Sequence, residues 1–200
     1  MATATQTKIS YEDFLEWTGE NQHVEWVDGE VFLMSPISNR HQDVGAFLIS
    51  LLRFYAEARH LGEVRYDPFQ MKIGPRFPGR APDILFVASA NALRLKSVFL
   101  DGPADLVVEI ISPESRARDR GEKFFEYEEG GVPEYWLLDP IRNQAEFYQR
   151  GENGLYRMVP PDVQGRYHSA ALPGLWLQVN WLWEIPLPPL LGVLKQWGLV

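Results

Sequence analysis

Three short, continuously apolar runs constrain the fold of this 200-residue chain more than any other feature. They cover residues 83–87, 105–111 and 135–139, and the first two begin on an aspartate. Short apolar runs that do not alternate with polar residues are typical of strands buried on both faces of a sheet. A charged helical pattern over 119–129 separates the second run from the third. This strand–helix–strand order predicts two parallel neighbours in one sheet.

A long amphipathic helix is predicted before these strands. Apolar residues recur at spacings of three and four from Val44 to Tyr55, which gives one apolar stripe. Ser38 or Asn39 can cap the start of this helix, and Gly62 can follow its end. The helix, the central sheet and the flanking hairpins together indicate a mixed α/β (α+β) protein.

Two hairpins are predicted outside the central unit. Asp28-Gly29 between two apolar runs is a strong signal for the first, and residues 145–159 have the pattern of the second. Residues 64–73 predict a strand with an irregularity at Pro68. Residues 74–82 are rich in Gly, Pro and Arg and predict a loop.

The domain organisation follows from the absence of any linker-like or repeated stretch. We expect a disordered tail over 1–9, a single domain over 10–186, and an apolar C-terminal segment over 187–200 that packs on the core or on a partner. That segment is shorter than the roughly 20 residues that span a bilayer, and Pro188 and Lys195 interrupt it. It can cover the core as a strap, or it can form a self-association surface. We expect a cytoplasmic protein with no membrane partner.

Composition removes several classes of function. The chain has no cysteine, which excludes disulfides, thiolate zinc sites, iron–sulfur clusters and a cysteine nucleophile. A net charge of −8 disfavours non-specific binding to nucleic acid, so such a partner would have to meet a local basic patch. The motifs of P-loop, dinucleotide-binding, zinc-protease and serine-hydrolase sites are absent.

Three polar residues occupy positions where the apolar pattern predicts burial or a cleft. Asp83 starts the first buried run, Glu109 lies inside the second, and Lys123 lies on the helix that follows. A buried carboxylate needs a cation, a hydrogen-bond donor or a proton. Two carboxylates on neighbouring strands could share Mg²⁺ or Mn²⁺, while an ammonium group stabilises charge developing on a phosphorus atom. Alternatively, Glu109 pairs with an arginine of the following segment and has only a structural role.

The order of these residues resembles the PD-(D/E)xK pattern of phosphodiesterases with restriction-endonuclease-like folds. More closely, the stretch from residue 25 to residue 139 resembles the Uma family of restriction-endonuclease-like proteins, formerly catalogued as a domain of unknown function. The motifs that carry this resemblance run in order over more than half of the chain. They are VDGEV (27–31), SP (35–36), RHQ (40–42), PDILFV (82–87), DLVVEIISPES (105–115), DRGEK (119–123) and GVPEYWLLDP (131–140).

The resemblance implies a restriction-endonuclease-like central sheet flanked by helices, with added N-terminal and C-terminal hairpins. It implies that Asp83 and Glu109 bind Mg²⁺ or Mn²⁺, with the backbone carbonyl of Ile110 as a further ligand. The implied activity is hydrolysis of phosphodiester bonds in nucleic acid, as by an endonuclease. One departure matters: the usual lysine two residues after the glutamate is Ile111 here. Lys123 can replace it only if the first turns of its helix pack near Glu109.

Two further residues are candidates for the catalytic site. His41 lies in the first turn of the long helix and could contact a phosphate or a metal-bound water. Glu25 lies on the first hairpin and could complete an acidic cluster. The alternatives are a histidine bonded to loop backbone and a solvated strand residue.

Arginines near the expected site are candidates for nucleic-acid binding. Residues 65–96 contain six Lys and Arg against two Asp, and residues 116–123 are also basic. The candidates are Arg80, Arg116, Arg118 and Arg120. Our interpretation is a Mg²⁺- or Mn²⁺-dependent endonuclease, with DNA favoured over RNA and a homodimer left open. The alternative is a catalytically inactive binding or scaffold module that keeps the nuclease fold.

Overall fold

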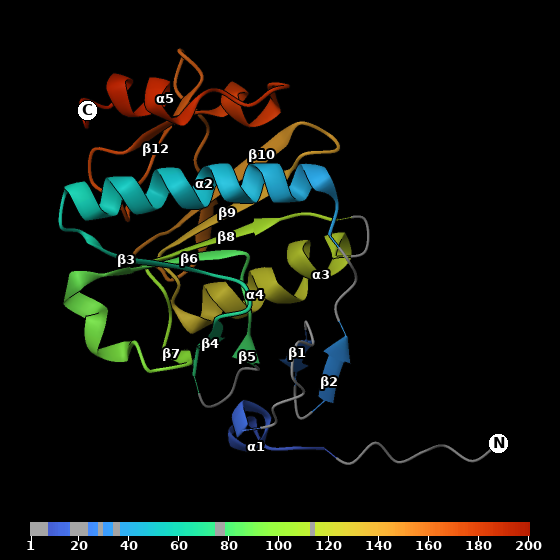
Figure 1. Cartoon of the computed structure of the whole chain (residues 1–200). Helices are drawn as coiled ribbons and strands as arrows, with labels where there is room; N and C mark the ends of the chain where they lie inside the picture. Colours follow the sequence, from blue (N-terminus) through green and yellow to red (C-terminus); the bar gives the residue numbers. More distant parts are fainter. Residues whose placement is uncertain (1–7, 17–23, 28–29, 34–36, 75–78, 113–114) are drawn as a thin grey trace.

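A six-stranded mixed sheet forms the centre of the molecule (Figure 1). The computed structural model describes residues 8–16, 24–27, 30–33, 37–74, 79–112 and 115–200. The strands of the sheet lie in the order β11-β10-β9-β8-β6-β3. Their bounds are β3 (Gly62–Tyr66), β6 (Ile84–Ala88), β8 (Leu106–Ile110), β9 (Glu134–Asp139), β10 (Gln144–Arg150) and β11 (Tyr156–Met158).

The three apolar runs of the sequence form the three inner strands β6, β8 and β9. Strands β8 and β9 are parallel neighbours, which confirms the predicted crossover. The other pairs in this sheet are antiparallel, including β6 with β8 and β3 with β6. Every residue of β8 and β9 is buried, as expected for strands covered on both faces.

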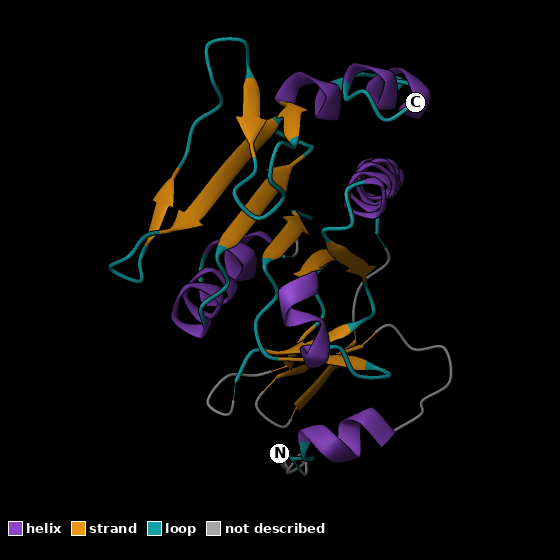
Figure 2. Cartoon of the chain, turned by 90° about the vertical axis from the view of Figure 1, so that its left-hand side faces the viewer, coloured by secondary structure: helices purple, strands orange, loops and turns teal. Residues whose placement is uncertain are grey.

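Helices cover both faces of this sheet. Helix α2 (Asn39–Ala58) and helix α5 (Leu190–Gln196) lie on one side, and α3 (Arg116–Arg120) and α4 (Glu122–Gly130) lie on the other. Figure 2 shows the two helical layers on opposite sides of the strands. Because side chains alternate along a strand, Val108 and Ile110 join the core beneath α2, whereas Val107 and Ile111 join the core beneath α4. Glu109 therefore belongs to the α4 side of β8.

Smaller elements complete the fold. The first hairpin is confirmed as β1 (Val24–Val27) paired with β2 (Glu30–Leu33), and the second as β10 paired with β11. A three-stranded sheet contains β4 (Gln70–Lys72), β5 (Gly79–Arg80) and β7 (Phe99–Asp101). A third hairpin joins β12 (Arg166–His168) to β13 (Trp176–Gln178). The remaining elements are α1 (Tyr11–Glu16) and the 3₁₀ helices η1 (Ser89–Arg94) and η2 (Val179–Trp183).

The structure corrects three details of the sequence analysis. The single strand predicted over 64–73 is two strands, because β3 belongs to the central sheet and β4 to the three-stranded sheet. The loop predicted over 74–82 contains β5, which pairs with β4. The helix predicted over 119–129 is divided at Gly121, where the backbone leaves helical geometry with φ −112° and ψ −96°.

The apolar C-terminal segment packs on the core beside α2. Val193, Leu194 and Trp197 are buried in the same cluster as the inward face of α2. The ring of Trp197 meets that of Tyr55 edge-on, with their centroids 5.4 Å apart. The segment therefore covers part of the core beside α2. Over the part of the chain that the structure describes, no helix is both long and apolar enough to cross a membrane.

Glu134 connects the central sheet to the C-terminal hairpin through a fully buried carboxylate. Its Oε1 accepts hydrogen bonds from Trp136 Nε1 (2.6 Å) and Tyr167 Oη (2.7 Å). Its Oε2 accepts from Ser169 Oγ (3.0 Å) and from the backbone N–H of Ala171 (2.6 Å). Four donors thus compensate the loss of solvation of one carboxylate.

We expect Glu134→Gln to lower the free energy of unfolding by about 3 kcal/mol, because an amide group cannot accept from all four donors and leaves at least one of them buried without a partner. Urea denaturation followed by circular dichroism measures this difference. Glu152→Gln is the matched control, since Glu152 is exposed and its substitution should change little. Equal stability of the two variants would contradict the structural role assigned to Glu134.

Candidate active site

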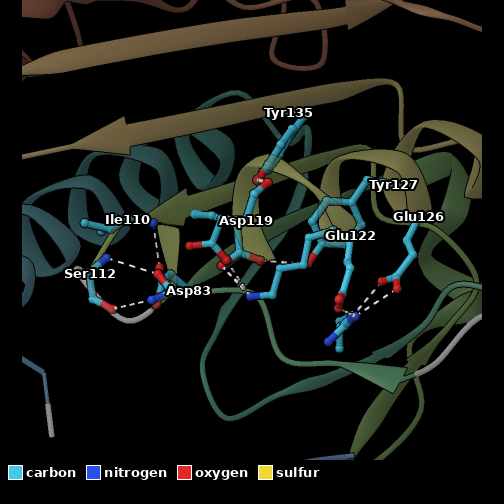
Figure 3. Close-up of polar contacts among 12 residues, drawn as sticks. Asp83, Ile110, Ser112, Asp119, Glu122, Glu126, Tyr127 and Tyr135 are labelled. Carbon is cyan, nitrogen blue, oxygen red and sulfur yellow. Dashed lines mark hydrogen bonds and ion pairs between the residues drawn. The ribbon is translucent and has the colours of Figure 1, made fainter. Parts of the chain in front are cut away.

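The candidate site lies where β8 ends and β6 begins. Because these strands are antiparallel, with Ile84 opposite Val108, the residue just before β6 lies beside the last residues of β8. Asp83 is that residue, and its Oδ2 accepts a hydrogen bond of 2.6 Å from the backbone N–H of Ile110 (Figure 3). The pairing of the two strands therefore places the Asp83 carboxylate next to the main chain that follows Glu109.

A histidine in the first turn of α2, His41, lies beside Asp83. Ser38 caps this helix by accepting a hydrogen bond of 3.2 Å from the backbone N–H of His41. The Nε2 atom of His41 lies 3.4 Å from Asp83 Oδ1. Burial lowers the pKa of His41, but the hydrogen bond and negative charge of Asp83 outweigh burial, and a hydrogen bond with the Ile110 backbone adds to them. The pKa of His41 is therefore raised above its usual value of 6.5.

On the α4 side, Glu109 is the centre of a buried polar cluster. Its Oε2 lies 3.0 Å from Lys123 Nζ, and its Oε1 accepts a hydrogen bond of 2.7 Å from Tyr127 Oη. Lys123 Nζ also lies 3.3 Å from Asp119 Oδ1 (Figure 3). Glu109, Asp119 and Lys123 are each at most 3% exposed. One ammonium group thus lies between two buried carboxylates.

The surroundings of Glu109 disfavour a negative charge on its carboxyl group. Burial is the largest effect and raises the pKa of Glu109 to about 8, although the ammonium of Lys123 acts in the opposite direction. The negative charges of Asp119 and Asp83 raise the pKa further. A proton on Glu109, or a cation close to Glu109 and Asp83, would offset this unfavourable negative charge.

Two residues of this cluster were not singled out as site residues from the sequence. Asp119 and Tyr127 lie four residues before and four residues after Lys123, so all three share one side of the α3–α4 segment. Tyr135 of β9 fixes the backbone of the same segment, because its hydroxyl donates a hydrogen bond of 3.1 Å to the Asp119 carbonyl. The i±4 spacing around Lys123 was the signal that could have identified both residues.

The structure brings Asp83, Glu109, Lys123, His41 and the Ile110 backbone together. The position required for Lys123 is met: the first turn of α4 packs against the end of β8. The side chain of Glu25 lies outside the described residues, so its proposed place in an acidic cluster stays a prediction.

The arginines predicted to bind nucleic acid differ in their exposure to solvent. Arg80 does not have the open position expected of a phosphate ligand: it is fully buried and makes hydrogen bonds of 2.7 and 2.8 Å to the carboxylate of Glu126. This pair connects β5 to α4. Arg120 lies 2.6 Å from Glu146 and is one-third exposed, and Arg118 is partly buried. The side chain of Arg116 lies outside the described residues.

A pocket of about 220 Å³ opens beside Asp83 on the α2 side of the sheet. His41, Asp67, Asp83 and Ile110 are among the residues that line it. The Asp83 side chain is 23% exposed, whereas that of Glu109 is 4% exposed. Asp83 is therefore the carboxylate that an incoming ligand would meet first.

The donor atoms present here fit a hard divalent cation. Within the described ranges, no group of three or more His, Cys, Asp or Glu side chains is already arranged to hold a metal ion. Asp83, Glu109 and the carbonyl of Ile110 nevertheless carry oxygen atoms of the kind that Mg²⁺ and Mn²⁺ prefer as ligands. Because the pKa of Glu109 is raised, a cation binding there would compete with a proton for this carboxylate.

Comparison with known proteins identifies the family of the chain. The model of the Uma2 family, described as "Putative restriction endonuclease", matches residues 11–180. The chain belongs to the Uma2 family. The matched residues include all the motifs that carry the family resemblance, and that resemblance is thereby confirmed.

One similar sequence and one similar structure illustrate how far the similarity of this Uma2 protein extends. An uncharacterized protein of Synechocystis sp., slr1290, is 25% identical over 149 residues, which are 74% of this chain and 77% of the relative. A crystal structure from Anabaena variabilis ATCC 29413, described as a putative nuclease belonging to DUF820, superposes with a TM-score of 0.69 at 16% identity. It covers 87% of this chain and 97% of the other. The superposition confirms the predicted fold class.

The His41–Asp83 pair predicts a pH-dependent contribution to stability. Because the pKa of His41 is raised in the folded protein, the contribution is fully present below the unfolded value of 6.5 and is lost as the pH rises through the folded value. We expect His41→Gln to destabilise the protein more at about pH 5.5 than at about pH 8.5. Urea denaturation of both proteins at the two pH values measures this. An equal difference at both pH values would contradict the ion pair.

Proposed function

We propose that this Uma2 protein is a divalent-metal-dependent nuclease that hydrolyses the phosphodiester backbone of nucleic acid as an endonuclease. One observation carries the proposal: Asp83, Glu109 and Lys123, far apart in the sequence, lie near one another where β8 ends and β6 begins, in a chain of this family. The family description and the fold of the similar Anabaena protein support the nuclease interpretation.

In this proposal Asp83, Glu109 and the Ile110 carbonyl bind Mg²⁺ or Mn²⁺. When bound, such a cation supplies a Lewis acid and a water of lowered pKa. Lys123 is held 3.0 Å from Glu109, where its ammonium would orient the attacking water and stabilise negative charge on the phosphate. His41, with its raised pKa, would donate a hydrogen bond to a phosphate oxygen in the pocket.

The substrate in this proposal is nucleic acid, with DNA favoured over RNA. Arg116, Arg118 and Arg120 lie on α3, the helix that precedes the lysine of the site, and would contact backbone phosphates. A homodimer would allow both strands of a duplex to be cut, by analogy with other proteins of this fold.

A catalytically inactive binding module is the second candidate function. Both oxygens of Glu109 already have partners, Lys123 and Tyr127, in the protein without a metal ion. A cluster that is complete without a cation would keep the fold without the chemistry. Metal binding and turnover distinguish the two candidates.

The first test is calorimetric titration with Mn²⁺. We expect wild type to bind, and we expect binding to be lost in Asp83→Asn and in Glu109→Gln, because each substitution removes one anionic ligand. Glu152→Gln is the matched control and should bind as wild type does. Unchanged affinity in both site variants would contradict the proposed ligand set.

The second test is cleavage of plasmid DNA and of labelled DNA and RNA oligonucleotides in Mn²⁺. We expect Lys123→Met to reduce the cleavage rate by about 100-fold while Mn²⁺ binding persists, since the lysine acts on the reacting groups and not as a ligand. Lys195→Met, on the exposed side of α5, is the control, and circular dichroism verifies folding. Nucleic-acid binding without turnover, lost when Arg116, Arg118 and Arg120 are replaced, would establish the binding module instead.

A further inference from the structure

A shallow groove continues from the candidate active-site pocket along α2. A second hollow, of about 490 Å³, has a lining that includes Arg53, Phe54 and Glu57 of α2. Ala46, Ile49 and Tyr66 line both this hollow and the pocket that contains Asp83. The two hollows therefore form one continuous surface that leads to the proposed site of cleavage.

Two aromatic rings on this surface are exposed to solvent. Tyr66 is 50% exposed and Phe54 is 51% exposed. Tyr66 ends β3 opposite Ile84, the neighbour of Asp83, and thus lies at the rim of the pocket. From His41 to Phe54 the rise of an α-helix spans about 20 Å. That length accommodates several nucleotides rather than a single small ligand.

Beyond His41, the charges of the groove are not those of a phosphate-binding surface. Among the described residues that line the second hollow, Arg53 is the one cation, and its Nε lies 3.0 Å from Glu57 Oε1. Asp67 and Asp83 add negative charge where the groove meets the pocket. A strand held here would be bound through its bases and not mainly through its phosphates. Bases present free faces for stacking only where they are unpaired.

We propose that Tyr66 and Phe54 form a stacking platform for an unpaired segment of a nucleic-acid strand, which the groove leads to Asp83. The inference rests on the proposed nuclease function and narrows its substrate to nucleic acid with a single-stranded region. Base–aromatic stacking is indifferent to the 2′-hydroxyl group, so DNA and RNA strands are both ligands of the platform.

The test is fluorescence anisotropy with labelled oligonucleotides of about 12 nucleotides, in EDTA so that nothing is cleaved. Single-stranded DNA, single-stranded RNA and duplex DNA of the same sequence are compared. We expect both single strands to bind more tightly than the duplex. Tyr66→Ala and Phe54→Ala should each weaken single-strand binding by about 5- to 100-fold, whereas Tyr66→Phe, which keeps the ring, should bind as wild type does.

Phe125→Ala is the matched control. Phe125 is 60% exposed and lies on α4, on the opposite side of the sheet. Its substitution removes an exposed aromatic ring of the same kind and should leave binding unchanged. The dependence on salt is a second readout: with few phosphate contacts, the slope of log K against log salt concentration should be shallower than about −2.

Several results would overturn the platform. They are tighter binding of the duplex, no binding of single strands, equal losses in Tyr66→Ala and Phe125→Ala, or a steep salt dependence. Dissociation of a dimer on Tyr66→Ala in analytical ultracentrifugation would assign the surface to a second copy of the chain instead. If wild type binds single strands in a Tyr66-dependent way but does not cleave them, the nuclease proposal is refuted and the platform stands. Cleavage that persists without this binding would refute the platform alone.

Discussion

A carboxylate buried in the middle of an apolar strand is the constraint on which the site depends. Glu109 lies on β8, where each neighbouring residue is packed in the core, so solvent cannot stabilise its charge. The chain compensates with Lys123 and Tyr127 from α4, each bonded to one oxygen of Glu109. This requirement explains why the short α3–α4 segment packs where it does.

The alternation of side chains along β8 divides the candidate site between the two faces of the sheet. Glu109 faces the closed α4 side, while Ile110 and the pocket at Asp83 lie on the α2 side. Asp83 connects the two faces. Its carboxylate accepts a hydrogen bond from the backbone N–H of Ile110, and its negative charge also raises the pKa of Glu109. The protein can therefore protect one carboxylate within its core and expose the other to a ligand.

Local patterns in the sequence were sufficient to predict the inner strands and a helix cap at Ser38 or Asn39, while the family resemblance implied that Lys123 approaches Glu109. They were not sufficient where a contact joins distant segments. Arg80 is an example. The Gly-, Pro- and Arg-rich stretch around it indicated an exposed cation, but Arg80 pairs with Glu126, which lies 46 residues away in the sequence. The four donors around Glu134 include residues up to 37 positions further along the chain. No periodicity encodes such pairs, since they arise only when the elements are packed.

An acidic chain can still bind nucleic acid if aromatic rings, and not arginines, supply most of the contacts. Arg80 is buried against Glu126 and stabilises the fold, while Arg120, which is one-third exposed, also pairs with Glu146. With a net charge of −8, attraction over long distances is weak. Recognition would then depend on short-range contacts, and the exposed rings beside the pocket provide them without added positive charge. Such a protein would select the form of its substrate, paired or unpaired, before it selects a sequence.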